Sequence, residues 1–302
     1  MIPPAPPLPL KTRVLGQFFL PVVALALTPE QRQQIETLGH QGRWAEARPL
    51  AQGWADAAPA DAEAQSWLGR SLLALGETSR AVTVLEKAVA LAPNSGGTMR
   101  LLGDAYGASA QKAGILAKAG WVKRCRVAFE KAVELDPKDL DAHWGLMEFY
   151  RQAPGFLGGG LDKARAQAEV IRALDAARGR AALVEIYLDE KKYPEAFALY
   201  DGPGPDQFGD YQPLYQLGKY ADTSGELLDR GLAALRRCLA ISPAGDSRGY
   251  APVLWRIGNI LARTGDPAGA RAAYAEAVKQ NPKFTEAAEA LGKLGATASG
   301  VN

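Results

Sequence analysis

The sequence predicts an all-α protein built from about seven stacked helical hairpins. Alanine is abundant and β-branched residues are sparse among the 302 residues, which favours helix along the whole chain. The segments 67–94 and 254–282 share one skeleton of leucine or isoleucine, glycine, alanine and a closing proline. Gly69 and Gly103 also lie 34 residues apart. A fixed period of this kind indicates units that bury their apolar faces against their neighbours.

The spacing inside one unit explains why it forms a hairpin. In residues 67–94, apolar residues at intervals of three and four give one face of a helix, and Gly76 suits its end. The second half spaces Ala81, Leu85 and Ala88 at four and three, so that a second helix packs closely against the first. The closing proline prevents that helix from continuing.

These residues resemble the tetratricopeptide repeat, a family with a period of about 34 residues and a Leu-Gly, aromatic, Ala, aromatic, Ala, Pro signature. The resemblance is strong in three units and partial in four more. It implies a right-handed superhelical solenoid closed by a C-terminal capping helix. The expected organisation is repeats 1–5 in residues 27–201, an irregular connector in 202–213, repeats 6 and 7 with the capping helix in 214–295, and a flexible tail in 296–302.

Two units depart from the period. The third contains an extra segment, residues 109–123, which is compatible with helix and is predicted to lengthen both helices of its hairpin. The fourth contains the stretch RQAPGFLGGGLDKARA, in which Gly155 and Gly160 are spaced as in a phosphate-binding loop. Such a loop needs a strand before it and Lys-Ser/Thr after its last glycine, and this stretch has neither. We therefore expect an enlarged turn, in which Phe156 and Leu157 either fold back onto the neighbouring hairpin or contact a partner.

The resemblance places ligand contacts on the first helix of each hairpin, at positions that the signature leaves free. These positions are Trp67, Arg70, Arg100, Asp104, Trp144, Glu148, Arg151, Glu185, Asp189, Tyr215, Lys219, Asp222, Trp255, Arg256, Asn259 and Arg263. Large aromatic side chains and arginine carry most of the binding energy at protein interfaces. Packing between adjacent hairpins explains the three tryptophans equally well. Charges of both signs alternate, which argues against capture of a carboxylate terminus.

The first 26 residues match a secretory signal peptide. Lys11 and Arg13 precede an apolar run of about a dozen residues, and Ala24-Leu25-Ala26 provides a cleavage site. We expect cleavage after Ala26 and a periplasmic protein with no integral membrane span. An uncleaved membrane anchor is the alternative, although the apolar run is shorter than the roughly 20 residues that a span requires.

Charge and cysteine content restrict the partners. Without residues 1–26 the chain keeps 33 basic and 33 acidic residues, and this neutrality argues against nucleic acid or an anionic membrane surface as a partner. Cys125 and Cys238 occupy inward positions of different units, where a free cysteine behaves as a small apolar residue. A disulfide between them is the alternative in an oxidising compartment.

The sequence offers no catalytic constellation. Its two histidines, His40 and His143, lie in different units without neighbouring ligands, and His143 is expected to be partly exposed. We expect no metal, no cofactor and no enzymatic activity. The favoured function is a non-catalytic scaffold or adaptor of the bacterial cell envelope that binds another protein or peptide. The alternative is a small-molecule or glycan binder, or an accessory subunit of an envelope enzyme complex. The oligomeric state is not encoded in any recognisable pattern.

Overall fold

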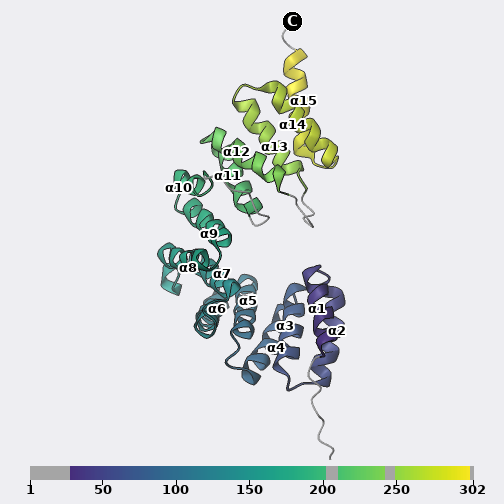
Figure 1. The fold of residues 1–302 in the computed structure, drawn as a ribbon, viewed down its shortest axis with the longest axis vertical. Helices are drawn as coiled ribbons and strands as arrows, with labels where there is room; N and C mark the ends of the chain where they lie inside the picture. The colour runs from purple at the N-terminus through teal and green to yellow at the C-terminus, as the bar shows by residue number, and fades with distance from the viewer. Residues whose placement is uncertain (1–27, 202–209, 242–248, 300–302) are drawn as a thin grey trace, which may run out of the picture.

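The computed structural model describes residues 28–201, 210–241 and 249–299, and these residues form an all-α solenoid, as predicted (Figure 1). The helices are α1 (Pro29–His40), α2 (Trp44–Ala57), α3 (Ala62–Ala74), α4 (Thr78–Leu91), α5 (Gly96–Lys112), α6 (Ile115–Leu135), α7 (Leu140–Gln152), η1 (Gly155–Leu157), α8 (Leu161–Leu174), α9 (Ala176–Asp189), α10 (Tyr193–Ala198), α11 (Tyr211–Ser224), α12 (Leu228–Ala240), α13 (Ala251–Arg263), α14 (Pro267–Gln280) and α15 (Thr285–Ser299).

Consecutive helices pair into seven hairpins, from α1–α2 to α13–α14, and α15 packs on the last one as the predicted cap. The first helices of neighbouring hairpins also touch one another, as α3 touches α5, α5 touches α7 and α11 touches α13. Because the first helices of neighbouring hairpins approach one another more closely than the second helices do, they form the inner side of a curve. Figure 1 shows the resulting arc, with the second helices outside.

Short polar side chains set the start of several first helices. Asp61, Asp139 and Asp175 each accept hydrogen bonds from two backbone N–H groups at the start of α3, α7 and α9. An aspartate at this position satisfies donors that have no partner within the helix. These caps therefore fix where α3, α7 and α9 begin, and with it the register of their side chains on the concave face.

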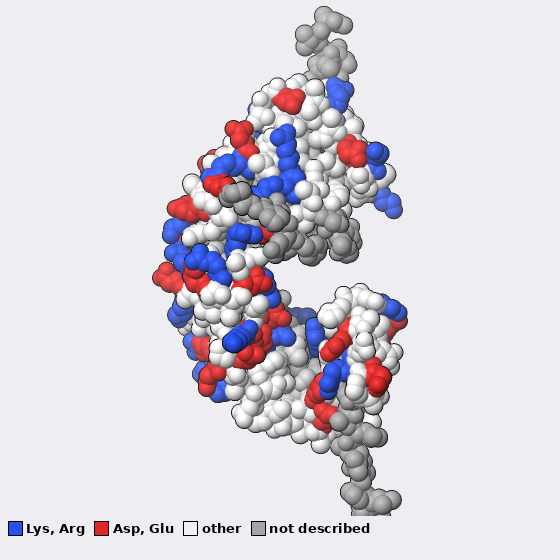
Figure 2. Space-filling model, in the orientation of Figure 1, with Lys and Arg blue, Asp and Glu red and all other residues white. Residues whose placement is uncertain are grey.

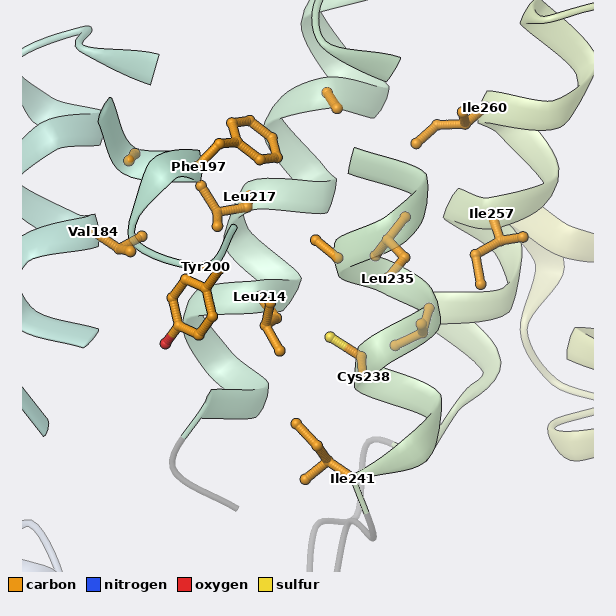
Figure 3. Packing of buried hydrophobic residues seen from close by; sticks show 14 of the residues in the cluster. Val184, Phe197, Tyr200, Leu214, Leu217, Leu235, Cys238, Ile241, Ile257 and Ile260 are labelled. Carbon is orange, nitrogen blue, oxygen red and sulfur yellow. The ribbon is translucent and has the colours of Figure 1, made fainter. Parts of the chain in front are cut away.

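The hydrophobic core runs along the solenoid as a series of clusters between hairpins. The largest joins α9 to α13, where Leu214, Leu217 and Leu235 are fully buried (Figure 3). Cys238 lies in this cluster, whereas Cys125 lies in the cluster around α5 and α6. Both cysteines are free and buried, so the expected apolar role is confirmed.

The third hairpin is lengthened as predicted, since α5 has 17 residues and α6 has 21. The fourth hairpin contains the enlarged turn. α7 ends at Gln152, the 3-10 helix η1 follows, and α8 starts after Gly160. η1 folds back onto α6, which leaves Leu157 half-buried and Phe156 87% exposed. Leu157 thus takes the first of the two expected roles, packing back onto the neighbouring hairpin. Phe156 is accessible for the second role, contact with a partner.

Two expected boundaries need correction. α11 begins at Tyr211, so the last residues of the expected connector, 211–213, are helical. α15 continues to Ser299, so the first residues of the expected tail, 296–299, are helical too. Residues 202–209 of the connector and residues 1–26 of the expected signal peptide lie outside the described residues.

Candidate functional site

The concave face is the candidate binding surface. All of the positions selected from the sequence lie on first helices, namely α3, α5, α7, α9, α11 and α13. Figure 2 shows the hollow that the arc encloses, with basic and acidic side chains interspersed along the molecule. The structure separates the selected residues into four groups, of which one lines a pocket, two form ion-pair networks and one is buried between two hairpins.

The first group forms an aromatic pocket near the N-terminal end. The guanidinium of Arg70 lies 5.3 Å from the ring centroid of Trp44 and 5.2 Å from that of Trp67. Cation–π contact with two rings holds this arginine in place while part of it stays accessible. Trp67 and Arg70 line a pocket of about 360 Å³ with Glu36, Gly39 and His40 from α1. The pocket thus offers a partner an aromatic wall with a charge of each sign beside it.

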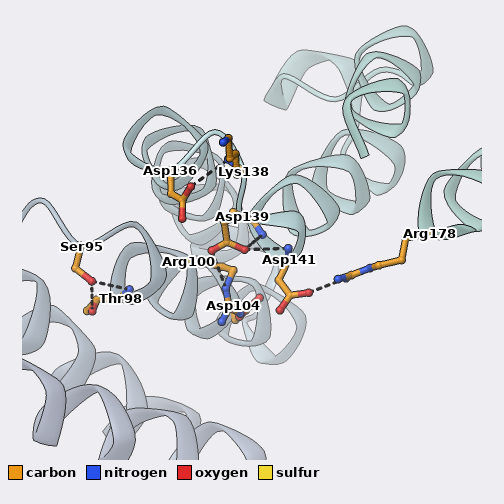
Figure 4. Close-up of polar contacts among 10 residues, drawn as sticks. Ser95, Thr98, Arg100, Asp104, Asp136, Lys138, Asp139, Asp141 and Arg178 are labelled. Carbon is orange, nitrogen blue, oxygen red and sulfur yellow. Dashed lines mark hydrogen bonds and ion pairs between the residues drawn. The ribbon is translucent and has the colours of Figure 1, made fainter. Parts of the chain in front are cut away.

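The second group is an ion-pair network on α5 and α7 (Figure 4). Arg100 contacts Asp104 one turn away at 3.2 Å, and it contacts Asp139 of the next hairpin at 3.5 Å. Arg178 of α9 contacts Asp141 at 2.6 Å. These contacts join three consecutive hairpins by opposite charges. Burial in the curved face raises the pKa of Asp104 to about 6, against the opposing effect of Arg100.

The third group places three carboxylates around one arginine. The guanidinium of Arg151 contacts Glu148 at 3.0 Å, Glu185 at 3.2 Å and Asp189 at 2.8 Å. One positive charge does not neutralise three carboxylates. Burial and the nearby Glu148 raise the pKa of Glu185 to about 7, because an additional negative charge is unfavourable there. Even with Glu185 protonated, the carboxylates of Glu148 and Asp189 exceed the single positive charge of Arg151, so these four groups together carry a net negative charge.

The fourth group lies on α11 and α13 and differs from expectation. Arg256 donates to Asp222 at 2.6 Å, and both residues are buried. Asn259 donates to the same carboxylate at 3.2 Å, and its own carbonyl accepts from Tyr274 at 2.9 Å. The side chains of Arg256 and Asp222 therefore connect two hairpins internally. Their expected availability to a partner was wrong, because each satisfies the buried charge of the other.

A second pocket lies where α15 covers the last hairpin. Its volume is about 450 Å³, and Trp255, Asn259 and Tyr274 line it on one side. Glu286, Glu289 and Lys293 of the capping helix line the other side. Trp255 also contacts Phe284 edge-to-face at 5.8 Å. This pocket, like the first, combines aromatic surface with charged residues.

Packing and exposure coexist in the three tryptophans. Trp67, Trp144 and Trp255 are each half-buried, and each packs against a cluster of buried residues. Trp67 and Trp255 also line pockets, while Trp144 lies 6.0 Å from the guanidinium of Arg178. The packing role is thus established for all three, and the binding role stays a prediction.

Sequence reasoning missed several residues of these groups, and it also misjudged the exposure of a histidine. The missed residues include Trp44, Glu36, His40, Asp139, Asp141, Arg178 and Tyr274, with Glu286, Glu289 and Lys293 of the second pocket. His143, which was expected to be partly exposed, is buried and makes hydrogen bonds to Gln167 and to the carbonyl of Pro137. Within residues 28–201, 210–241 and 249–299, no group of three His, Cys, Asp or Glu is placed to hold a metal ion.

Comparison with known families identifies the repeats. Models of the tetratricopeptide repeat match residues 33–96 and residues 251–294. The chain thus contains tetratricopeptide repeats near both ends of an all-α solenoid. No curated protein matches the sequence.

Solved structures share the fold. A tetratricopeptide repeat protein of Thermus thermophilus is 24% identical with a TM-score of 0.51, over 70% of this chain and 98% of that one. One from Parabacteroides merdae is 13% identical with a TM-score of 0.50, over 88% and 97%. A chain of an APC/C hetero-tetramer is 15% identical with a TM-score of 0.55, over 89% and 49%. At these identities the likeness concerns the fold alone.

Among the helices of the described residues, none combines the length and the apolar character that crossing a membrane requires.

Proposed function

We propose that the protein is a non-catalytic scaffold of the bacterial cell envelope, which binds a segment of another protein along its concave face. Tetratricopeptide repeats generally mediate protein–protein interaction, and the repeats near both ends of this chain support such a role. The observation that carries the proposal for this particular surface is the arrangement of Glu148, Glu185 and Asp189 around the single Arg151.

The chemistry of that centre defines the partner. A lysine or arginine beside Glu185 would neutralise charge that Arg151 leaves unbalanced, and it would form charge-assisted hydrogen bonds. The two pockets at the ends of the solenoid add aromatic surface for apolar side chains of the same segment. We therefore propose an extended partner segment with a basic residue near its middle and apolar residues toward its ends.

Export belongs to the same proposal. Residues 1–26 have the charged, apolar and small-residue regions of a signal peptide, and removal after Ala26 would release the solenoid into the periplasm. The N-terminal sequence of the protein recovered from the cell envelope tests this step. A chain that starts at Leu27 supports export, and a chain that keeps the apolar run supports the membrane-anchor alternative.

Site-specific crosslinking tests the binding surface. A photoreactive residue at Glu185, on the concave face, should capture a partner that the same residue at Glu169, on the outer helix α8, does not. With the partner purified, Glu148→Gln combined with Glu185→Gln should weaken binding about tenfold or more, because charge-assisted bonds are lost. Glu169→Gln is the matched control, since Glu169 pairs with Arg172 outside the groove.

The other candidate functions predict different outcomes. Equal affinity of the double variant and the control would exclude the concave centre as the binding site. A melting shift with sugars or peptides, without any protein partner, would favour the small-molecule or glycan binder. Turnover of a substrate by the purified protein would overturn the non-catalytic role.

A further inference from the structure

Arg70 on α3 differs from the other half-buried arginines of residues 28–201, 210–241 and 249–299. Each of the others contacts a carboxylate or a backbone carbonyl oxygen. Arg70 has no ion pair or hydrogen bond with these residues, and the rings of Trp44 and Trp67 hold its guanidinium instead. Burial and the positive charge of Arg100 lower the pKa of Arg70. Its N–H donors are therefore available to an acceptor from outside the chain.

An unpaired negative charge lines the same pocket as Arg70. Glu36 on α1 is exposed, and it forms no ion pair or hydrogen bond with the described part of the chain. Its carboxylate is near enough to Arg70 to act on that guanidinium electrostatically, yet the two groups are not in contact. The pocket thus presents one positive and one negative group, each without a counter-ion beside it.

The tryptophans orient the guanidinium and give the pocket its apolar wall. Gly39 on α1 allows the ring of Trp44 to approach, because a Cβ atom at this glycine would lie 2.7 Å from Cη2 of Trp44. Trp67 precedes Arg70 by one turn of α3 and lines the pocket. Cation–π contact with two indoles restricts the guanidinium before any ligand arrives, so less conformational freedom is lost on binding.

The size and charges of this pocket restrict its occupant. Its volume of about 360 Å³ is near the lower limit of the range of about 300–1,000 Å³ for sites that bind small molecules. A simple anion would be attracted to Arg70 but repelled by Glu36, and a simple cation would meet the reverse arrangement. A small molecule with both charges and one aromatic ring matches every group that lines the wall.

We propose that this pocket binds a small aromatic zwitterion, of the chemical class of the aromatic α-amino acids. The ligand's carboxylate accepts charge-assisted hydrogen bonds from Arg70, and its ammonium group is attracted to Glu36. Its ring lies against the indole of Trp67. This site goes beyond the proposed binding of a protein segment and does not depend on it. A ligand held here would compete with such a segment only at the N-terminal end of the concave face.

Fluorine NMR of the full chain, with fluorotryptophan in place of its six tryptophans, tests the site with probes of different charge. Trp67→Phe assigns the resonance of Trp67. L-phenylalanine has both charges, N-acetyl-L-phenylalanine keeps only the carboxylate, and L-phenylalanine amide keeps only the ammonium group. L-phenylalanine should shift the Trp67 resonance to saturation. Each analogue should need about tenfold more ligand or higher for half of its shift, because one charged contact is missing.

Two variants assign each charge of the ligand to its side chain. Arg70→Gln should weaken binding of L-phenylalanine about tenfold and leave it no better than the amide, which lacks the carboxylate. Glu36→Gln should likewise make L-phenylalanine and its N-acetyl form equal. Glu36 is exposed, so its substitution leaves the packing of the hairpins intact. Arg263→Gln and Glu195→Gln change the same charges at exposed positions outside the pocket and should have no effect.

Three outcomes would overturn the proposal. Equal binding of L-phenylalanine and its N-acetyl form by the wild type would indicate a plain carboxylate site. The absence of a saturable shift with all three probes would leave the pocket as part of the surface for a protein segment. Equal losses in the control variants would place the binding elsewhere. None of these measurements involves a protein partner or the carboxylates around Arg151, so their failure is distinct from a failure of the proposed function.

Discussion

The guanidinium of Arg256 on α13 donates a hydrogen bond of 2.6 Å to the carboxylate of Asp222 on α11, and both residues are buried between two hairpins. Tyr215 accepts a second hydrogen bond from Arg256 at 3.2 Å. The pair therefore belongs to the joint between the sixth and seventh repeats. In a solenoid, stability depends on such interfaces between neighbours as much as on each hairpin itself.

Removing one partner of this pair should destabilise the joint. Asp222→Ala leaves the buried guanidinium of Arg256 without its counter-ion, which we expect to lower the free energy of unfolding by about 3 kcal/mol. Hydrogen exchange should show the loss first in α11 and α13, because repeat proteins open locally. An apolar replacement of both, Asp222→Leu with Arg256→Met, should recover much of the loss.

An exposed ion pair provides the control for this experiment. Arg32 on α1 and Glu63 on α3 also join two hairpins, with 2.7 Å between their charged atoms, but both side chains are 44% exposed. Glu63→Ala should therefore cost less than about 1 kcal/mol. Equal losses for Asp222→Ala and Glu63→Ala would show that burial does not determine the strength of these joints.

The repeat glycines were predictable from the sequence because they perform a steric task. A Cβ atom at Gly69 would lie 2.4 Å from Cγ of Leu85, and one at Gly218 would lie 2.3 Å from Cγ of Leu235. Each glycine thus lets the second helix approach the first. Because close approach leaves no choice of residue, the spacing of glycine and leucine predicts the hairpin from the sequence alone.

Gly69→Ala should consequently destabilise the second hairpin. The added methyl group would collide with the fully buried Leu85, and we expect a loss of about 1–3 kcal/mol. Gly53→Ala, inside α2, is the matched variant, because nothing lies within 4 Å of its added Cβ. That change should stabilise the helix by about 0.5–1 kcal/mol. Urea unfolding monitored by circular dichroism compares the two, and a stabilising effect of both would contradict the steric argument.

The site was less predictable than the fold, since its interactions join positions one repeat apart. Arg178 and Asp141 are 37 residues apart, and Arg256 and Asp222 are 34 apart. Opposite charges at this spacing on first helices are a usable signal, and it would have identified Asp141. The same signal does not distinguish a buried pair from an exposed one. Burial depends on how tightly neighbouring hairpins pack, which single positions do not reveal.

The enlarged turn provides a test at two adjacent residues. Leu157 is half-buried where η1 meets α6, so Leu157→Ser should lower the free energy of unfolding by about 1 kcal/mol. Phe156 is 87% exposed, so Phe156→Ser should change it by less than about 0.5 kcal/mol. Thermal unfolding of the two variants measures the difference. A larger loss for Phe156→Ser would mean that this ring packs against the protein in solution.

The carboxylates around Arg151 predict a specific dependence of stability on pH. Burial and Glu148 raise the pKa of Glu185 from an ordinary 4.5 to about 7. The folded protein therefore holds a proton on Glu185 more tightly than the unfolded chain does. This stabilising contribution is complete below about pH 4.5 and is lost as the pH rises through about 7. The melting temperature should thus decrease as the pH rises from about 4.5 to about 7.

Glu185→Gln isolates this contribution, because glutamine stays neutral at every pH. The variant should lose part of the wild-type decrease in melting temperature between about pH 5 and about pH 8, while Glu195→Gln, at an exposed position on α10, should keep all of it. Asp104 adds a decrease of the same sign that ends near its own pKa of about 6, so some slope should survive in the Glu185 variant. An unaltered slope in Glu185→Gln would show that its carboxyl is already ionised when the concave face is empty. In that case Glu185 would release no proton when a basic partner binds. If Glu185 is instead protonated in the free protein, it would release its proton when the cation of the partner binds.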